Sequence, residues 1–256
     1  MPINLTDYER GEPFTGDYHA TLTALQQRLA HLQVAQIAHR KRALIIFEGW
    51  AGAGKEAALQ RLAASWNPCH LTTLCTAGAE AGDDERHWLA PFWSALPAAG
   101  DTTIFFGSWY RRLIEARIAG RTDDKRWARA CDEVNEFEAQ QRDHGTLVVK
   151  LFFHVSAAEQ LDRLRQRQED PWRRHLMSKE DMSTLGQRDQ TSAVLHDMFA
   201  QTDTRWAPWR VIDANDEHSA RIATLTALAD ALTKSVPADP PAQGETVVAF
   251  PQQKSA

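Results

Sequence analysis

The stretch that most constrains the fold is ALIIFEGWAGAGKEAA, residues 43–58. The apolar run from Leu44 to Phe47 predicts a buried strand, and the alanine-rich segment after Lys55 predicts a helix. Between them, the chain from Gly49 to Lys55 fits the pattern G-x-x-x-x-G-K. In that pattern, small residues let backbone N–H groups approach phosphate oxygens, and the lysine reaches their outer charge. The stretch therefore predicts a strand, a phosphate-binding loop and a helix.

We expect phosphate to be bound by Gly49, Gly52, Ala53, Gly54, Lys55 and Glu56. Glu56 stands where the standard pattern has the Ser or Thr whose hydroxyl binds magnesium. Its carboxylate either replaces that ligand or repels the incoming phosphate. Repulsion is favoured, because Ala51 offers no second carboxylate to complete an octahedral site. Glu56 is thus the one candidate metal ligand of the loop.

The composition is that of one globular domain. A chain of 256 residues is long enough to cover both faces of a sheet with helices. The formal net charge of −5 argues against a surface built for nucleic acid. The cysteines include no C-x-x-C pair, which indicates neither a disulfide framework nor a zinc site. Without a long apolar run or a signal-peptide pattern, we expect a cytoplasmic protein with no membrane segment.

Helical and strand patterns alternate along the chain. Besides the first strand, strands are expected at 70–76, 102–106, 146–155 and 210–213. Helices are expected after the loop and at 17–40, 111–144, 156–174, 179–200 and 220–232. This order predicts an α/β fold, a three-layer α/β/α sandwich with a five-stranded, mainly parallel sheet. We expect an N-terminal extension at 1–16, the domain at 17–235 and a flexible, proline-rich tail at 236–256.

The segment 156–174 opens with Ser156 as a helix N-cap and Glu159 as its partner in a capping box. Positive charge is concentrated after it, in Arg163, Arg165, Arg167, Arg173 and Arg174. Most clusters of this kind are solvated helix faces. Opposite a phosphate loop, arginines can instead form a mobile lid that neutralises a transferring phosphoryl group. Both interpretations stay open, and such a lid would cover about 160–190.

Further motifs accompany the phosphate loop. In chain order they are WNP at 66–68, RHWLAPFWSALPAAGD at 86–101, SWYRR at 108–112, EVNEFE at 133–138, KLFFHVSAAEQLDRL at 150–164, EDPWR at 169–173 and TDTRWAPWRVIDANDEHSARI at 202–222. With the loop, these motifs resemble the polyphosphate kinase 2 family, phosphate-loop kinases that move phosphate between inorganic polyphosphate and nucleotides. The resemblance covers roughly residues 17–232 and implies a phosphate-loop kinase fold with a helical lid.

The resemblance also implies roles for individual residues. The implied catalytic residues are Lys55, Arg112, Arg163 and Arg167, and the implied substrate-binding residues are Arg86, Ser108, Tyr110, Arg173 and Arg221. It implies Mg²⁺ as the cofactor, polyphosphate and a nucleotide as substrates, and assembly into a homo-oligomer.

The chain departs from the family pattern where the metal is positioned. Family members carry an Asp at the position of Ala51, and an Asp or Asn followed by Arg at the positions of Phe106 and Gly107. Both usual metal-positioning groups are replaced, so the family implies Mg²⁺ while these residues do not. The pattern resembles the degenerate half of tandem family members.

Two functions follow from these observations. The first is an enzyme that moves phosphate between polyphosphate and a nucleoside mono- or diphosphate. The second is a catalytically impaired family member that binds polyphosphate or an active partner as a regulatory subunit. A nucleic-acid binder is a weak third hypothesis, because the arginines lack interleaved exposed aromatic residues. The sequence leaves the first two open.

Overall fold

The computed structural model describes residues 3–76, 86–177 and 185–242. Its strands are β1 (Arg42–Gly49), β2 (Leu71–Cys75), β3 (Thr102–Phe106), β4 (Thr146–His154) and β5 (Trp209–Asp213), paired in the order β2-β3-β1-β4-β5. Its α-helices are α1 (Tyr18–Ala38), α2 (Lys55–Ala63), α3 (Ala90–Trp93), α4 (Trp109–Ile118), α5 (Asp124–Asp143), α6 (Ala157–Glu169), α8 (Arg188–Thr202) and α9 (Glu217–Ser235). Short 3-10 helices are η1 (Leu5–Tyr8), η2 (Pro68–His70) and η4 (Arg173–Leu176). All pairings of these five strands are parallel, which confirms the predicted fold class.

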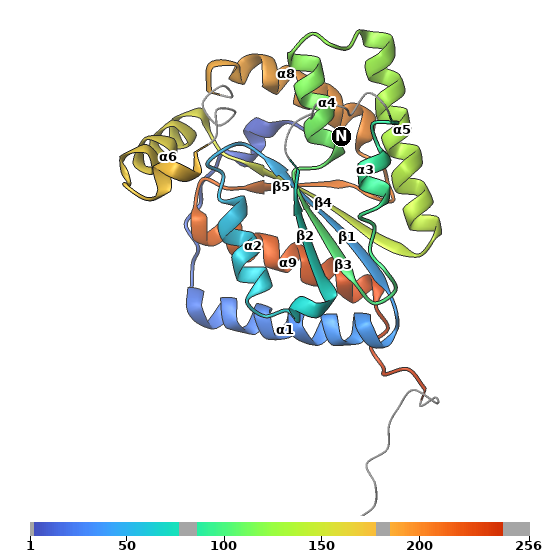
Figure 1. Ribbon diagram of the computed structural model, residues 1–256. Helices are drawn as coiled ribbons and strands as arrows, with labels where there is room; N and C mark the ends of the chain where they lie inside the picture. Colours follow the sequence, from blue (N-terminus) through green and yellow to red (C-terminus); the bar gives the residue numbers. More distant parts are fainter. Residues whose placement is uncertain (1–2, 77–85, 178–184, 243–256) are drawn as a thin grey trace, which may run out of the picture.

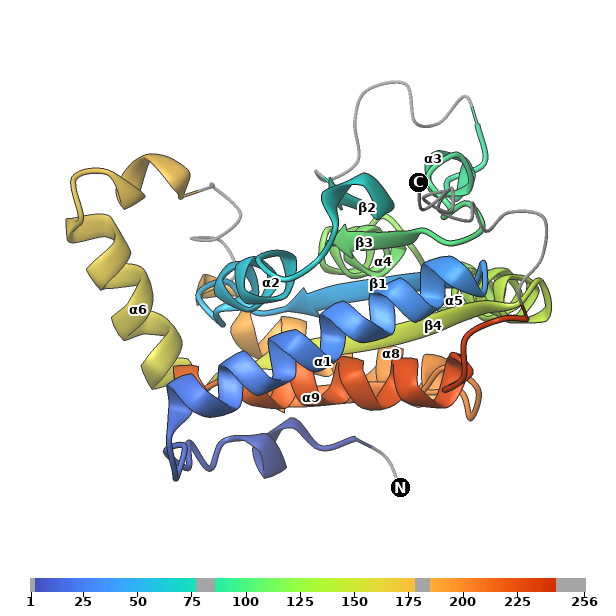
Figure 2. The ribbon, with the colours of Figure 1, turned by 90° about the horizontal axis from the view of Figure 1, so that it is seen from below.

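Helices cover both faces of the sheet (Figure 1). On one face α1, α2 and α9 pack against one another, and on the other α4, α5 and α8 do so. Figure 2 shows α6 projecting from the body of the domain on the side of α2. No helix in the described ranges is long and apolar enough to cross a membrane.

The middle strand, β1, brings the loop to one edge of the sheet. Its residues from Ala43 to Phe47 are at most 1% exposed, as expected for an apolar strand covered on both faces. Phe47 is in register with Phe106 of β3, and Glu48 with Phe152 of β4. Because the strands are parallel, the carboxyl ends of β3 and β4 flank the loop that follows β1.

Two predicted helices end earlier than expected. The predicted helix at 111–144 is two helices, because Gly120 takes a left-handed conformation (φ 65°) after α4 and Asp123 caps the N-terminus of α5. The predicted helix at 156–174 ends at Glu169. The next residue, Asp170, precedes a proline and is extended, with ψ 122°.

The start of α6 confirms half of the predicted capping box. Ser156 Oγ accepts a hydrogen bond from the N–H of Glu159. The reciprocal half is wrong, because the Ser156 N–H donates to Asn215 Oδ1 over 2.9 Å and Glu159 Oε1 accepts from Arg163. The first turn of α6 is therefore bound to the loop that follows β5.

A buried ion pair joins β4 to the helices on one face of the sheet. Lys150 Nζ lies 2.9 Å from Glu138 Oε2 of α5, 3.0 Å from Tyr110 Oη of α4 and 2.7 Å from the carbonyl oxygen of Thr202 in α8. The Lys150 and Glu138 side chains are 0% exposed. Burial lowers the pKa of Lys150, while the carboxylate of Glu138 raises it. Lys150 thus binds three helices to one strand.

Candidate phosphate-binding site

The phosphate loop turns directly out of β1. Gly49 has φ 134°, and a Cβ on it would lie 2.3 Å from the carbonyl oxygen of Phe153 in β4, so only glycine fits. Ala53 is buried and donates its N–H to the carbonyl of Trp50 over 3.2 Å. Gly54 has φ 79° and is the N-cap of α2. The backbone of the turn therefore requires the glycines that open and close the motif.

Side chains bind the carbonyl oxygens of four successive loop residues, Gly49 to Gly52. Lys55 Nζ lies 2.7 Å from each of the first two oxygens. From α6, Gln160 Nε2 lies 3.1 Å from the third oxygen and Arg163 Nη1 lies 3.2 Å from the fourth. With its carbonyls bound, the loop is held in one conformation in advance of a ligand, which lowers the cost of ordering it.

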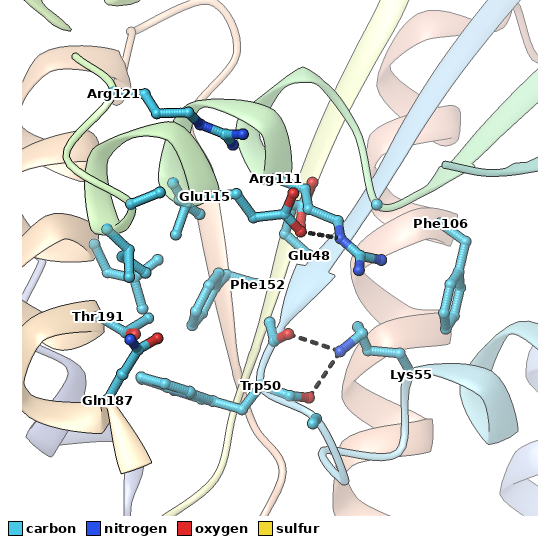
Figure 3. A pocket seen from close by; sticks show the side chains of 17 residues that line it. Glu48, Trp50, Lys55, Phe106, Arg111, Glu115, Arg121, Phe152, Gln187 and Thr191 are labelled. Carbon is cyan, nitrogen blue, oxygen red and sulfur yellow. Dashed lines mark hydrogen bonds and ion pairs between the residues drawn. The ribbon is translucent and has the colours of Figure 1, made fainter. Parts of the chain in front are cut away.

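The loop opens on a pocket of about 440 Å³ between β1, α4 and α8 (Figure 3). Polar side chains on its lining are Glu48, Lys55, Arg111, Glu115, Arg121 and Gln187. Apolar side chains on its lining are Trp50, Phe106, Ile114, Ile118, Phe152 and Leu195. Pockets of this size hold small organic ligands. The two kinds of wall suit a ligand with a charged end and a flat, apolar end.

Glu48 lies on this lining, buried at the end of β1. Its Oε1 accepts from both the backbone N–H and the hydroxyl of Ser108, each over 2.7 Å. Burial raises the pKa of Glu48, whereas the hydrogen bonds from Ser108 and the charges of Lys55 and Arg111 lower it. Arg111 Nε also donates to Glu115 Oε1 over 2.7 Å. Figure 3 shows the guanidinium of Arg111 extending into the pocket toward Lys55.

The predicted catalytic residues do not lie together. Lys55 lines the pocket, and Arg163, 12% exposed, holds the loop. Arg112 is outside the pocket lining, with its guanidinium carbon 5.2 Å from the ring centroid of Phe92. Arg167 is half-buried on α6, also outside that lining. The structure therefore brings the lysine and one arginine to the loop.

The predicted substrate-binding residues are dispersed. Ser108 is buried and donates to Glu48, and Tyr110 is buried in the network of Lys150. Arg173 on η4 is 75% exposed, and Arg86 is exposed beside α3. Arg221 pairs with Glu217 on α9. None of these five side chains is part of the described lining of the pocket.

The face that α4 presents to the pocket was not among the predicted site residues. The lining includes four residues of this helix, Arg111, Ile114, Glu115 and Ile118. Their spacing of i, i+3, i+4 and i+7 marks one helix face and was the signal available. Arg112, the next residue, points about 100° away around the helix. Glu48 carried a second signal, as a lone carboxylate at the end of an apolar strand.

Comparison with known proteins gives one family. Residues 14–240 match the family described as polyphosphate kinase 2 (PPK2). The polyphosphate:AMP phosphotransferase of Pseudomonas syringae pv. tomato is 33% identical over 225 residues, which are 87% of this chain and 45% of that protein. The GDP-polyphosphate phosphotransferase of Mycolicibacterium smegmatis is 34% identical over 209 residues, 82% of this chain and 74% of that protein. The chain thus spans about half the length of the polyphosphate:AMP phosphotransferase.

Solved structures show the same likeness. The crystal structure of a polyphosphate kinase 2 from Arthrobacter aurescens has a TM-score of 0.87 and 28% identity, covering 96% of this chain and 90% of that one. A structure from Pseudomonas aeruginosa, titled as a polyphosphate kinase 2, has a TM-score of 0.83 and 31% identity, covering 91% of this chain and 50% of that one.

Proposed function

The chain belongs to the polyphosphate kinase 2 family, and on this premise we propose that it moves phosphate between inorganic polyphosphate and a nucleoside mono- or diphosphate. The observation that carries the proposal is the phosphate loop, whose carbonyls are bound and whose Lys55 borders a pocket with one apolar wall. Relatives are named for transfer involving AMP, ADP or GDP. These names support the substrate class.

In the proposed reaction, a phosphate oxygen of the acceptor nucleotide attacks the terminal phosphorus of polyphosphate. The bond from that phosphorus to its bridging oxygen breaks, and a polyphosphate one unit shorter leaves with the electron pair. Lys55 and the loop N–H groups hold the phosphates, while Arg111 and Arg121 add positive charge. The apolar wall positions the nucleoside. Catalysis of such transfer consists mainly of positioning and charge neutralisation.

The residues at this site do not fit a carboxylate-held magnesium ion. Phosphate-loop enzymes hold Mg²⁺ through a hydroxyl after the loop lysine and an Asp from another motif. Here Glu56 is exposed in the first turn of α2, and Phe106 ends β3. The described lining of the pocket has two carboxylates, Glu48 and Glu115. Glu48 accepts a hydrogen bond from Ser108, and Glu115 accepts one from Arg111. The described residues contain no group of three or more His, Cys, Asp or Glu that could hold a metal.

Two new carboxylates should therefore create a magnesium-dependent site. In Ala51→Asp/Phe106→Asp, one lies in the loop and the other at the adjacent end of β3. We expect the transfer rate at saturating Mg²⁺ to rise about tenfold over wild type and to fall with EDTA. Initial rates across a Mg²⁺ titration measure this, and rates equal to those of wild type would count against it. Adding Gly107→Arg should lower stability, since Gly107 has φ 77° and a Cβ there would lie 2.9 Å from Thr76 Oγ1.

A product assay tests the proposed function directly. Purified protein is incubated with polyphosphate and AMP, ADP or GDP, with Mg²⁺ or with EDTA, and the nucleotides are separated and quantified. We expect at least one acceptor to gain a phosphate and the Lys55→Ala variant to lose that activity. A wild-type protein that binds polyphosphate but phosphorylates none of the three nucleotides would overturn phosphoryl transfer and leave a binding subunit.

A further inference from the structure

Trp50, in the phosphate loop, is held by side chains from two neighbouring elements. Its indole Nε1–H donates to Nδ1 of His154, at the end of β4, over 2.8 Å. The guanidinium carbon of Arg188, in α8, lies 4.2 Å from the Trp50 ring centroid. Trp50 and His154 are each 3% exposed. The loop side chain is therefore fixed by a contact that water does not reach.

Hydrogen-bond chemistry defines the tautomer of His154. An indole N–H can only donate, so Nδ1 of His154 must be an unprotonated acceptor. The ring proton of the neutral imidazole is then on Nε2, which lies 2.9 Å from Glu9 Oε1. A carboxylate can only accept, so it matches this N–H. Glu9, His154 and Trp50 are hydrogen-bonded together in this tautomer alone.

The N-terminal segment brings Glu9 to this place. Residues close to Glu9 in the sequence are bound to the end of β5 and the loop after it: Asn215 Nδ2 donates to the carbonyl of Tyr8 over 3.3 Å, and the N–H of Gly11 donates to Asp213 Oδ2 over 2.9 Å. Glu9 is thus positioned by contacts that are independent of His154.

The backbone of Trp50 carries this constraint into the loop. Its N–H donates to the carbonyl of Phe153 over 3.1 Å, and its carbonyl accepts from Lys55 Nζ over 2.7 Å. Trp50 therefore connects β1 to the phosphate-binding Lys55. A change in the orientation of its indole would shift the backbone groups that make these two hydrogen bonds.

We propose that Glu9 and His154 are positioning residues for the phosphate loop: Glu9 selects the tautomer of His154 that anchors Trp50, and the anchored loop holds the transferred phosphates. That the loop holds the transferred phosphates rests on the proposed function, whereas the anchoring of Trp50 by His154 and Glu9 does not. The N-terminal segment therefore helps to hold the phosphate loop in its conformation.

Acid should weaken the anchor. A proton on Nδ1 would replace the acceptor by a donor facing the indole N–H. Burial lowers the pKa of His154, opposed by Glu9, with Arg188 of α8 lowering it and Asp213 of β5 raising it. In the unfolded chain, the imidazole takes up a proton at its ordinary pKa of about 6.5, whereas the fold keeps it neutral. Its contribution to stability is therefore lost as the pH falls below about 6.5. Because the pKa of His154 is lowered in the fold, the anchor should be complete at neutral pH and be lost below about 6.5.

Nitrogen NMR tests the anchor without a ligand. The His154 and Trp50 ring resonances are identified by their loss in His154→Asn and Trp50→Phe. At pH 7.5 we expect His154 of the wild-type protein to carry its proton on Nε2. The Trp50 indole resonance should move in Glu9→Ala and stay near its wild-type position in Glu9→Gln, whose amide oxygen still accepts. Glu12→Ala, at an exposed neighbour, is the control. A proton on Nδ1, or an indole resonance unmoved by Glu9→Ala, would overturn the anchor.

Polyphosphate titrations test the consequence for the loop. We expect Glu9→Ala and Trp50→Phe each to weaken binding about fivefold, the effect of one lost hydrogen bond. The double variant should lose no more than Trp50→Phe alone, because both changes break one chain of contacts. Additive losses, or no loss in Glu9→Ala, would contradict the positioning role. If wild-type protein fails to bind polyphosphate, the proposed function fails, and the NMR result still decides the anchor.

Discussion

Replacing Lys150 by Met should lower the free energy of unfolding by about 3–5 kcal/mol. Methionine has a similar length, but it leaves the carboxylate of Glu138 without a cation at 0% exposure. Tyr110 Oη, which donates to Glu138 Oε1 over 2.7 Å, also loses the donor that Lys150 provides. An unpaired charge is costly at this position, because water cannot solvate it. Urea denaturation followed by circular dichroism measures the loss.

Two further variants separate the ion pair from the change in side chain. Lys150→Met/Glu138→Leu removes both charges and should recover most of the loss, as replacement of whole buried pairs generally does. Lys125→Met makes the same substitution at an exposed lysine on α5 and should change stability by less than about 0.5 kcal/mol. A Lys150→Met protein that unfolds at the same urea concentration as wild type would contradict the account of the buried pair.

The strand, loop and helix at 42–63 could be predicted because their signals are local. An apolar run specifies β1, and the glycines that the turn requires stand in the motif itself. The same holds for the other strands, which are short β-branched or aromatic runs between loops. Element order then constrains the fold class, because helices between strands favour parallel pairing.

The lining of the pocket could not be predicted in the same way. Arg111 and Arg112 are adjacent in the sequence, and only the rotation of α4 against the sheet decides which of them enters the pocket. The far wall comes from Gln187, Thr191 and Leu195, about 140 residues from the loop. Lys150 lies in the strand predicted at 146–155, yet its partners on α4 and α5 depend on tertiary packing.

The docking of the N-terminal segment could not be predicted from local patterns either. Residues 1–16 were expected to form an extension, and no local pattern indicates their docking. In the described part, the Ser219 hydroxyl donates to the carbonyl of Glu12 over 2.8 Å, and the N–H of Phe14 donates to Asp216 Oδ1 over 3.3 Å. These contacts join residues more than 200 positions apart. The boundary between residues 1–16 and the domain at 17–235 stays a prediction. The contacts described here join the two parts.

The helical lid at about 160–190 stays a prediction. Arg163 donates to the loop, as a lid residue would. Arg173 is 75% exposed and its Nε lies 3.8 Å from Asp170 Oδ2, which is typical of a solvated helix face. Part of the expected lid, 178–184, lies outside the described residues, as do the loop at 77–85 and most of the predicted tail. Assembly into a homo-oligomer also stays a prediction.

Replacing Lys55 by Ala should weaken polyphosphate binding about 10–100-fold. Lys55 is the only lysine or arginine between Gly49 and the start of α2. A charge-assisted hydrogen bond to phosphate contributes about 1.5–3 kcal/mol, which corresponds to this loss of affinity. The substitution also removes the donor that binds the carbonyls of Gly49 and Trp50, so the loop becomes less ordered. Lys55→Arg retains the charge and should retain more of the affinity than the alanine variant.

The central claim is that the phosphate loop holds polyphosphate, and an equilibrium titration tests it most directly. Polyphosphate is titrated into wild type, Lys55→Ala and Lys125→Ala by calorimetry at one ionic strength, because screening changes all such affinities. Lys125→Ala removes the same charge from an exposed position on α5 and controls for nonspecific attraction. We predict unchanged affinity in Lys125→Ala and a loss of about 10–100-fold in Lys55→Ala. Equal affinities for polyphosphate in wild type and Lys55→Ala would contradict the claim.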